Sequence, residues 1–293
     1  MTDAHLAPGA AGAAPAERYV VLGNPVAHSQ SPFIHAAFAR QTGEPVNYDR
    51  LLCAPDGFED AVRDFAAGGG RGCNVTLPFK FQVPALAQRV TPRAALAQAA
   101  NVLRFDADGW LADNTDGVGL VRDIEDHADR PLAGQRVLLI GAGGGAAGAL
   151  GPLIQARPRA VQIVNRSPQR ALALAQRHAD WAQRHGVVLS AGGLDAAGSA
   201  HDIVLNASAS SLQGAAVPVP GSVLAPGALA LDLMYGDAAL PFMAWARAHG
   251  AQPRDGLGML VEQAAAAFHL WRGVRPDTRP VLQALRARLA APA

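Results

Sequence analysis

The stretch RVLLIGAGGGAAG, residues 136–148, runs from an apolar segment through a cluster of glycines into an alanine-rich segment. Gly141, Gly143 and Ala146 follow the G-x-G-x-x-A spacing of dinucleotide-binding turns. The first glycine permits a tight turn, the second lets the backbone approach a pyrophosphate, and the small third residue lets helix and strand pack closely. A helix that begins there also presents its N–H groups to phosphate. The stretch therefore predicts a strand, a turn and a helix of a Rossmann-type domain.

The end of the next strand indicates which dinucleotide such a domain binds. VQIVN, residues 161–165, is the expected strand; Arg166 and Ser167 follow Asn165, and Arg170 lies one turn into the next helix. Sites for NAD usually carry Asp or Glu at this point for the ribose 2′-hydroxyl, whereas a 2′-phosphate suits a guanidinium. Because an acid is absent here and arginine is present, we predict NADP. The alternative is that both arginines are surface charges.

Short β-rich runs alternate with helix-length segments along the chain, which is the pattern of an α/β fold. Runs that are apolar on both faces suit parallel strands covered by helices; they are YVVLG (19–23), GCNVT (72–76), DIVLNA (202–207) and ALALDLMY (228–235). Ser31 and Ser167, each followed by proline, predict helix N-caps. Further helices are expected over residues 259–271 and 280–289.

The length of 293 residues suits two domains. We expect a doubly wound Rossmann-type NADP domain over residues 117–256, with the PLAG break at 131–134 before its first strand. Residues 18–116 and 257–293 are expected to form one other α/β domain, with the C-terminal helices packing back across the boundary. Residues 1–17, mostly Ala, Gly and Pro, are expected to be a disordered tail.

The composition argues against several classes of protein. The net charge of +1 gives no sign of a nucleic-acid or membrane surface, and no apolar run reaches the ~18–20 residues of a membrane span. Two cysteines, Cys53 and Cys73, cannot form a disulfide framework, and they fit a reducing cytoplasm. No Cys/His cluster has metal-ligand spacing, so no metal is expected. The sequence leaves monomer and homodimer open.

A second stretch, NVTLPFK at 74–80, ends in the only lysine of the chain. An ammonium can release and recover a proton when its surroundings change, whereas a guanidinium stays protonated. Lys80 is therefore a candidate for proton exchange, the alternative being an ordinary surface charge. Other segments offer hydroxyl, amide and carboxylate groups that suit a small polyol acid; they bring Ser29 and Ser31, Asn101, Asp116 and Gln263.

Taken together, these segments resemble the shikimate dehydrogenase family over residues 19–289. The motifs, in chain order, are GNPVAHSQSP, GGRGCNVTLPFK, AANVL, DNTDGVG, LLIGAGGGA, NRS, DLMY and GLGMLVEQAA. The resemblance implies reversible reduction of 3-dehydroshikimate to shikimate with NADPH, a step of aromatic amino-acid biosynthesis. It also implies an α/β substrate domain completed by C-terminal helices, with a Rossmann domain between.

The resemblance further assigns roles to residues. Lys80 and Asp116 fall on the family's catalytic pair. The substrate carboxylate would meet Ser29 and Ser31, with Tyr235 nearby. The ring hydroxyls would meet Asn74, Thr76, Asn101, Asp116 and Gln263. The cofactor contacts would be Gly141, Ala142, Gly143, Gly144, Gly145, Ala146, Asn165, Arg166, Ser167, Leu233 and Gly256.

Two departures and three alternatives accompany this reading. Asn206-Ala-Ser-Ala-Ser replaces the more usual Asn-Ala-Thr-Ser, and MYGDAALPF lacks the polar residue often found before its proline. A quinate/shikimate dehydrogenase of the same family is one alternative, and methylenetetrahydrofolate dehydrogenase is a more distant one. A non-catalytic NADP-binding regulator would be expected to lose Lys80 or Asp116. The sequence leaves open whether Lys80, Asp116 or a water carries the proton.

Overall fold

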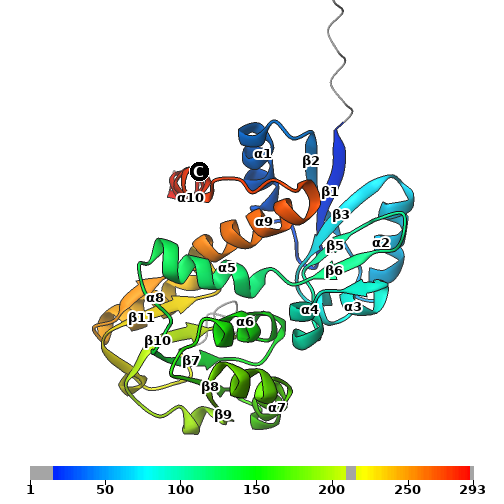
Figure 1. Cartoon of the computed structure of the whole chain (residues 1–293). Helices are drawn as coiled ribbons and strands as arrows, with labels where there is room; N and C mark the ends of the chain where they lie inside the picture. Colours follow the sequence, from blue (N-terminus) through cyan, green and yellow to red (C-terminus); the bar gives the residue numbers. More distant parts are fainter. Residues whose placement is uncertain (1–15, 209–215, 291–293) are drawn as a thin grey trace, which may run out of the picture.

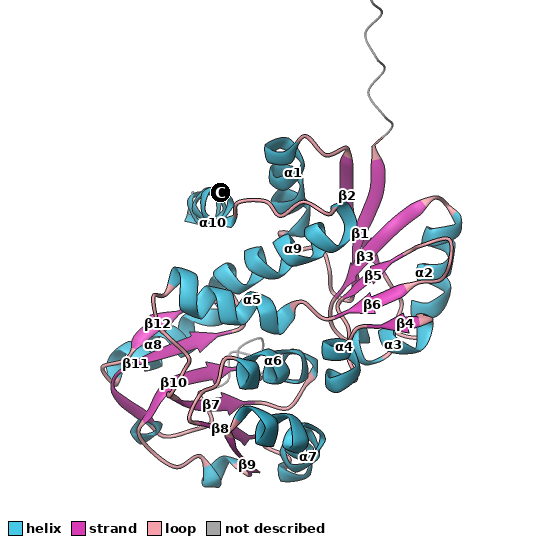
Figure 2. Ribbon diagram, viewed as in Figure 1, coloured by secondary structure: helices cyan, strands magenta, loops and turns pink. Residues whose placement is uncertain are grey.

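The computed structural model describes residues 16–208 and 216–290, and these build two six-stranded sheets (Figures 1 and 2). All strands of the first sheet come from residues before 114, and all strands of the second lie between 136 and 254. The two-domain α/β prediction of the fold is confirmed. Residues 1–15 of the expected tail lie outside the described residues. The predicted end of the tail at residue 17 was wrong, because Glu17 begins the first strand and forms an ion pair with Arg272.

The first sheet has the strand order β2-β1-β3-β5-β6-β4. Its strands are β1 (Glu17–Gly23), β2 (Val46–Leu52), β3 (Gly70–Val75), β4 (Arg89–Val90), β5 (Val102–Arg104) and β6 (Leu111–Asp113). β5 runs antiparallel to its neighbours β3 and β6, whereas the other pairs are parallel. The start of β5 therefore lies at the same edge as the ends of β3 and β6. That edge carries Asn101, Thr76 and Asn114.

Helices cover both faces of this sheet. They are α1 (Ser31–Thr42), α2 (Phe58–Ala67), the short turn η1 (Phe79–Phe81), α3 (Val83–Leu86), α4 (Pro92–Ala97), α9 (Leu257–Arg272) and α10 (Thr278–Ala290). One face packs Phe58, Phe65 and Phe79 in a core with α2 and η1, and the other packs α1 against α9 and α10. The C-terminal helices α9 and α10 thus complete the domain of the first sheet, as the sequence predicted.

The second sheet is wholly parallel, in the order β12-β11-β10-β7-β8-β9. Its strands are β7 (Arg136–Ile140), β8 (Ala160–Val164), β9 (Val188–Gly192), β10 (His201–Asn206), β11 (Leu224–Asp232) and β12 (Gln252–Arg254). Its helices are α6 (Gly144–Gln155), α7 (Pro168–His185) and α8 (Leu240–Ala248). This is the Rossmann strand order, in which ligands bind at the carboxyl ends near the switch between the two central strands.

One connecting segment lies between the sheets. α5 (Asp116–Arg122) continues into a π-helical turn, η2 (Asp123–His127), and packs along α9 (Figure 1). Leu120 and Ile124 of this segment belong to the core of the second sheet. α5 therefore contacts both layers, and its first residue is Asp116.

The sequence predicted Ser31 as the N-cap of α1, and this prediction was wrong. Ser31 is the first residue of the helix, Gln30 holds the cap position, and no side chain there makes a capping hydrogen bond. The Ser31 hydroxyl instead accepts a hydrogen bond from Ser29 Oγ at 3.1 Å. Ser167, by contrast, does hold the cap position of α7, with Pro168 after it. No helix within the described residues is both long and apolar enough to span a membrane.

Candidate active site

The centre of the candidate site is an ion pair between Lys80 and Asp116. Lys80 Nζ lies 2.6 Å from Asp116 Oδ2, and their side chains are only 15% and 5% exposed. Lys80 sits in η1, which Phe79 anchors by stacking on Phe58 at 4.7 Å between ring centroids. The backbone oxygen of Lys80 also accepts the N–H of Ala100 at 2.9 Å. The ammonium is thus held on a short, firmly packed turn.

A buried amide, Asn101, organises the polar groups around this pair. Its Nδ2 donates to Asp116 Oδ1 at 2.8 Å and to Gln263 Oε1 at 3.1 Å. Its Oδ1 accepts the backbone N–H of Thr115 at 2.8 Å. Gln263 comes from α9, so the C-terminal helix supplies one wall of the site. The structure therefore brings together Lys80, Asn101, Asp116 and Gln263 from four segments of the chain.

A second hydrogen-bonded group adjoins Asn101 and involves a residue that the sequence did not single out. The Tyr48 hydroxyl donates to Asn74 Oδ1 at 2.7 Å, and Asn74 Nδ2 donates to the backbone oxygen of Asn101 at 3.2 Å. Burial raises the pKa of Tyr48 well above its ordinary value, and a hydrogen bond with Ser31 opposes that rise. Tyr48 thus holds the side chain of Asn74 in place. No motif signals Tyr48, because its role depends on the pairing of β2 with β1.

Ser29, Ser31 and Tyr235 form the outer end of the site. The Ser29 and Ser31 hydroxyls lie 3.1 Å apart, and Arg50 donates two hydrogen bonds to the backbone oxygen of Ser29. Burial raises the pKa of Tyr235, while a hydrogen bond to the Gln30 backbone and the charge of Arg50 lower it. Tyr235 is therefore a neutral, half-buried phenol beside the 29–31 segment.

Thr76 lies directly after β3. Its backbone N–H donates to the Leu22 oxygen at 2.9 Å, and its methyl group packs against Gly23. A Cβ at Gly23 would lie 2.3 Å from that methyl carbon, so only glycine leaves room for Thr76 here.

The glycine-rich turn follows β7 at the carboxyl edge of the second sheet. Gly141 has a φ of 113°, and a Cβ there would lie 2.9 Å from the Ala207 backbone. At Gly143 a Cβ would meet no atom within 4 Å, so the backbone at this position faces open space. Ala142 and Ala146 complete the turn into α6. The turn has the open backbone surface that a pyrophosphate requires.

The same turn lies against the lysine segment. A Cβ at Gly144 would lie 3.5 Å from Lys80 Cβ, and one at Gly145 would lie 3.5 Å from Leu233 Cδ2. Gly256 lies close by, since a Cβ there would meet the Leu233 oxygen at 2.3 Å. The start of α6, which is suited to phosphate, and the candidate proton donor are thus neighbours across the two sheets.

Asn165, Arg166 and Ser167 follow β8 at the same edge of the sheet. Asn165 Nδ2 donates to the Ser167 backbone oxygen at 3.0 Å, which folds this segment into a tight turn. Arg166 and Arg170 are exposed, and neither guanidinium pairs with a carboxylate of residues 16–208 or 216–290. The residues present fit a ribose that carries a 2′-phosphate.

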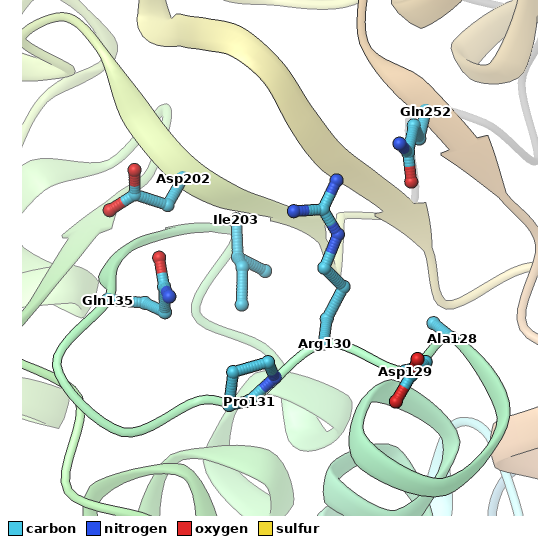
Figure 3. Close-up of a pocket in the computed structure, with 8 residues that line it drawn as sticks. All are labelled: Ala128, Asp129, Arg130, Pro131, Gln135, Asp202, Ile203 and Gln252. Carbon is cyan, nitrogen blue, oxygen red and sulfur yellow. The ribbon is translucent and has the colours of Figure 1, made fainter.

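Asn206 ends β10 at the same edge as the glycine-rich turn, and its backbone oxygen accepts the Leu233 N–H at 2.9 Å. The side chain of Asn206 donates to Asp232 Oδ2 at 2.9 Å, but Ala209 and Ser210 of the unusual Asn-Ala-Ser-Ala-Ser run are outside the described residues. A pocket of about 400 Å³ opens at the amino ends of β7, β10 and β12 (Figure 3). It is lined by Arg130, Asp202, Gln252 and their neighbours, so it lies at the edge opposite the glycine-rich turn.

The fold and this geometry define a two-domain dehydrogenase of the Rossmann type, with a dinucleotide turn facing a buried lysine–aspartate pair. Three family models match the chain. They describe the shikimate dehydrogenase substrate binding domain (residues 21–103), shikimate/quinate 5-dehydrogenase (124–213) and the shikimate 5′-dehydrogenase C-terminal domain (256–286). The chain belongs to the shikimate dehydrogenase family.

Individual relatives agree with this membership. The chain is 62% identical to a shikimate dehydrogenase (NADP(+)) of Methylibium petroleiphilum, covering 94% of this chain and 96% of the relative. Among solved structures, an Ael1 enzyme from Pseudomonas putida matches with a TM-score of 0.84 at 43% identity, over 94% and 99% of the two chains. The shikimate 5-dehydrogenase of Thermus thermophilus, solved with shikimate, matches with a TM-score of 0.78 at 31% identity, over 94% and 100%.

Proposed function

We propose that this protein catalyses the reversible reduction of 3-dehydroshikimate to shikimate with NADPH, in aromatic amino-acid biosynthesis. The observation that carries the proposal is the Lys80–Asp116 pair, 2.6 Å apart and adjacent to the glycine-rich turn at Gly144. Relatives named shikimate dehydrogenase (NADP(+)), at up to 62% identity over nearly the whole chain, support the substrate and the cofactor.

The cofactor would bind along the carboxyl edge of the second sheet. Gly141 to Ala146 would hold the pyrophosphate, Asn165, Arg166 and Ser167 the phosphorylated ribose, and Leu233 and Gly256 the nicotinamide end. Bound NADPH supplies the hydride. Arg166, exposed and free of a carboxylate partner within the described chain, suits a 2′-phosphate, because guanidinium matches phosphate geometry in a bidentate manner.

The substrate would lie between the two sheets, with its carboxylate at Ser29, Ser31 and Tyr235. The ring hydroxyls would meet the residues around the buried amide, namely Asn74, Thr76, Asn101, Asp116 and Gln263. These side chains offer both donors and acceptors in fixed orientations, since each amide is already held by a neighbour. Such fixed groups position a polyol ring without reorganisation during the reaction.

Lys80 would act as the general acid in the reductive direction. During reduction negative charge would develop on the carbonyl oxygen of the substrate, and the Lys80 ammonium would donate a hydrogen bond and then its proton to that oxygen. Asp116 holds the ammonium in place and contacts the hydroxyl that forms. In the oxidative direction the neutral amine takes the proton back. Acid–base assistance of this kind contributes about 10²–10⁴ in rate.

We also propose the domain division of 18–116 with 257–293 against 117–256, and action in the cytoplasm as a monomer or homodimer. The distribution of the two sheets along the chain supports the division. Cys53 and Cys73 are buried free thiols, which suits a reducing compartment. The chemistry proposed for Lys80 requires no metal.

The test is to follow NADPH formation from NADP⁺ by absorbance with purified protein, with shikimate and quinate in parallel. Efficient turnover of shikimate and much slower turnover of quinate is the expected result. A clear preference for quinate would replace the proposed function by that of a quinate dehydrogenase. Binding of NADP⁺ without turnover of either compound would indicate a non-catalytic protein.

A further inference from the structure

The substrate of the proposed reaction is an anion, yet the groups around its carboxylate are neutral. Ser29 and Ser31 offer hydroxyls, and Tyr235 is a phenol whose pKa burial raises. Lys80, the cation at the centre of the site, is already paired with Asp116 at 2.6 Å. Removing a carboxylate from water without a counter-charge is costly. A substrate carboxylate at Ser29, Ser31 and Tyr235 would therefore be stabilised by a positive charge other than that of Lys80.

Arg50 stands at this position. It lies in β2, paired with Val21 of β1, and its Nε and Nη2 donate to the Ser29 backbone oxygen at 3.0 and 2.6 Å. The guanidinium is thus bound to the backbone of Ser29, the residue whose hydroxyl contacts the Ser31 hydroxyl. Its charge also reaches Tyr235, the third expected carboxylate contact, where it lowers the phenol pKa.

This guanidinium keeps its full charge for a ligand. Asp49, the nearest acid in sequence, accepts the Arg50 backbone N–H at 2.7 Å. Across the described ranges 16–208 and 216–290, the arginines that pair with carboxylates do not include Arg50. Bonds to a carbonyl oxygen fix the orientation of a guanidinium without neutralising it. Arg50 is therefore an oriented and unpaired cation.

We propose that Arg50 is a specificity residue, whose unpaired guanidinium selects substrates that carry a carboxylate at Ser29 and Ser31. This inference rests on the proposed function and adds to it the residue that recognises the negative charge. Because the charge acts equally on the bound substrate and on the transition state, it affects binding rather than the chemical step. Arg50 acts at the end of the substrate remote from Lys80.

The expected effect follows from the exposure of Arg50. Because Arg50 is exposed, water screens its interaction with a bound carboxylate, and surface-like attraction of this kind is worth about a tenfold change in Kd. The effect should also weaken at high salt, because exposed charges are screened.

The test compares two ligands of nearly the same shape, shikimate and its primary carboxamide, which lacks the charge. Kd values are measured by calorimetry for the wild type and for Arg50→Met. We expect Arg50→Met to weaken shikimate about tenfold and the carboxamide less than about twofold. Arg50→Lys, which keeps the charge, should restore shikimate binding to within about threefold of the wild type.

A matched control is Arg40→Met, which removes the same charge from the exposed far end of α1. It should leave both Kd values unchanged. Equal weakening of both ligands by Arg50→Met would show that Arg50 only shapes the 29–31 segment, and it would overturn the inference. Unchanged Kd values would overturn it as well. Wild-type protein that binds shikimate but does not turn it over would instead refute the proposed function and leave the Arg50 result standing.

Discussion

Replacement of Asp116 by asparagine tests how much the ion pair between Lys80 and Asp116 contributes to the free energy of unfolding. The two carboxylate oxygens of Asp116 each face a donor. Oδ2 accepts from Lys80 Nζ at 2.6 Å, and Oδ1 accepts from Asn101 Nδ2 at 2.8 Å. Asparagine has the same shape, but it offers one oxygen and one NH₂ group. Whichever way the amide turns, its NH₂ group faces either the ammonium or the Asn101 amide.

The cost can be bounded from the burial of the pair. Breaking a buried ion pair from one side typically destabilises a protein by about 3–5 kcal/mol. The Lys80 side chain is 15% exposed, so water can reach part of the ammonium and the lower end applies. We expect Asp116→Asn to lower the free energy of unfolding by about 3 kcal/mol.

The assay is equilibrium unfolding in urea, followed by tryptophan fluorescence, with Asp108→Asn as the control. Asp108 also pairs with an arginine, Arg89, but its side chain is 75% exposed. Its replacement should cost no more than about 0.5 kcal/mol. Equal losses of unfolding free energy in the two variants would refute the reasoning, because they would show that the Lys80–Asp116 pair stabilises the protein no more than a surface pair does.

Two other predictions concern the cofactor and the buried histidine. Arg166→Gln should raise the KM for NADP⁺ by about tenfold or more and leave the KM for NAD⁺ unchanged, because a charge-assisted hydrogen bond to the 2′-phosphate is lost. Arg159→Gln, at the other end of β8, is the control. Equal changes in KM for both cofactors would contradict the assignment of Arg166 to the 2′-phosphate. Burial lowers the pKa of His35 from 6.5 to about 3, and neither nitrogen of its ring has a hydrogen-bond partner within the described residues. Below the unfolded pKa of 6.5 the unfolded chain takes the proton first, so stability falls as the pH falls towards 3, by up to about 1.4 kcal/mol per pH unit. His35→Phe should remove this contribution, so urea unfolding at about pH 6 and about pH 5 should show a pH-dependent loss about 1 kcal/mol smaller than in the wild type; identical losses would contradict a neutral buried imidazole.

The Rossmann half of the fold was predictable because its signals are local. The strand, the turn at Gly141 and the start of the helix follow one another within residues 136–148. The glycines occur where the backbone needs a positive φ or open space around it. The antiparallel direction of β5 was not predicted, since a strand of three residues carries no signal of its direction. That reversal matters for the site, because it places Asn101 beside Asp116.

The candidate site was predicted as a set of residues and not as an arrangement. Motifs identified Lys80 and Asp116, but only the fold gives the 2.6 Å between them. Ser31 was misread as a cap because the Ser-Pro pattern is the same whether the hydroxyl faces its own helix or a neighbour. Tyr48 and Arg50 were missed because they lie in a strand and act through the register of β2 against β1. The catalytic and binding roles of these residues stay predictions.

The central claim is that Lys80 transfers a proton, and Lys80→Arg tests it most directly. Arginine keeps the positive charge and can donate a hydrogen bond, but it cannot give up its proton. The measurement is kcat for shikimate oxidation, with the Kd of shikimate from calorimetry to show that the site still binds. We predict that kcat falls by at least about 10²-fold while Kd changes less than about tenfold. A kcat close to that of the wild type would contradict proton transfer by Lys80.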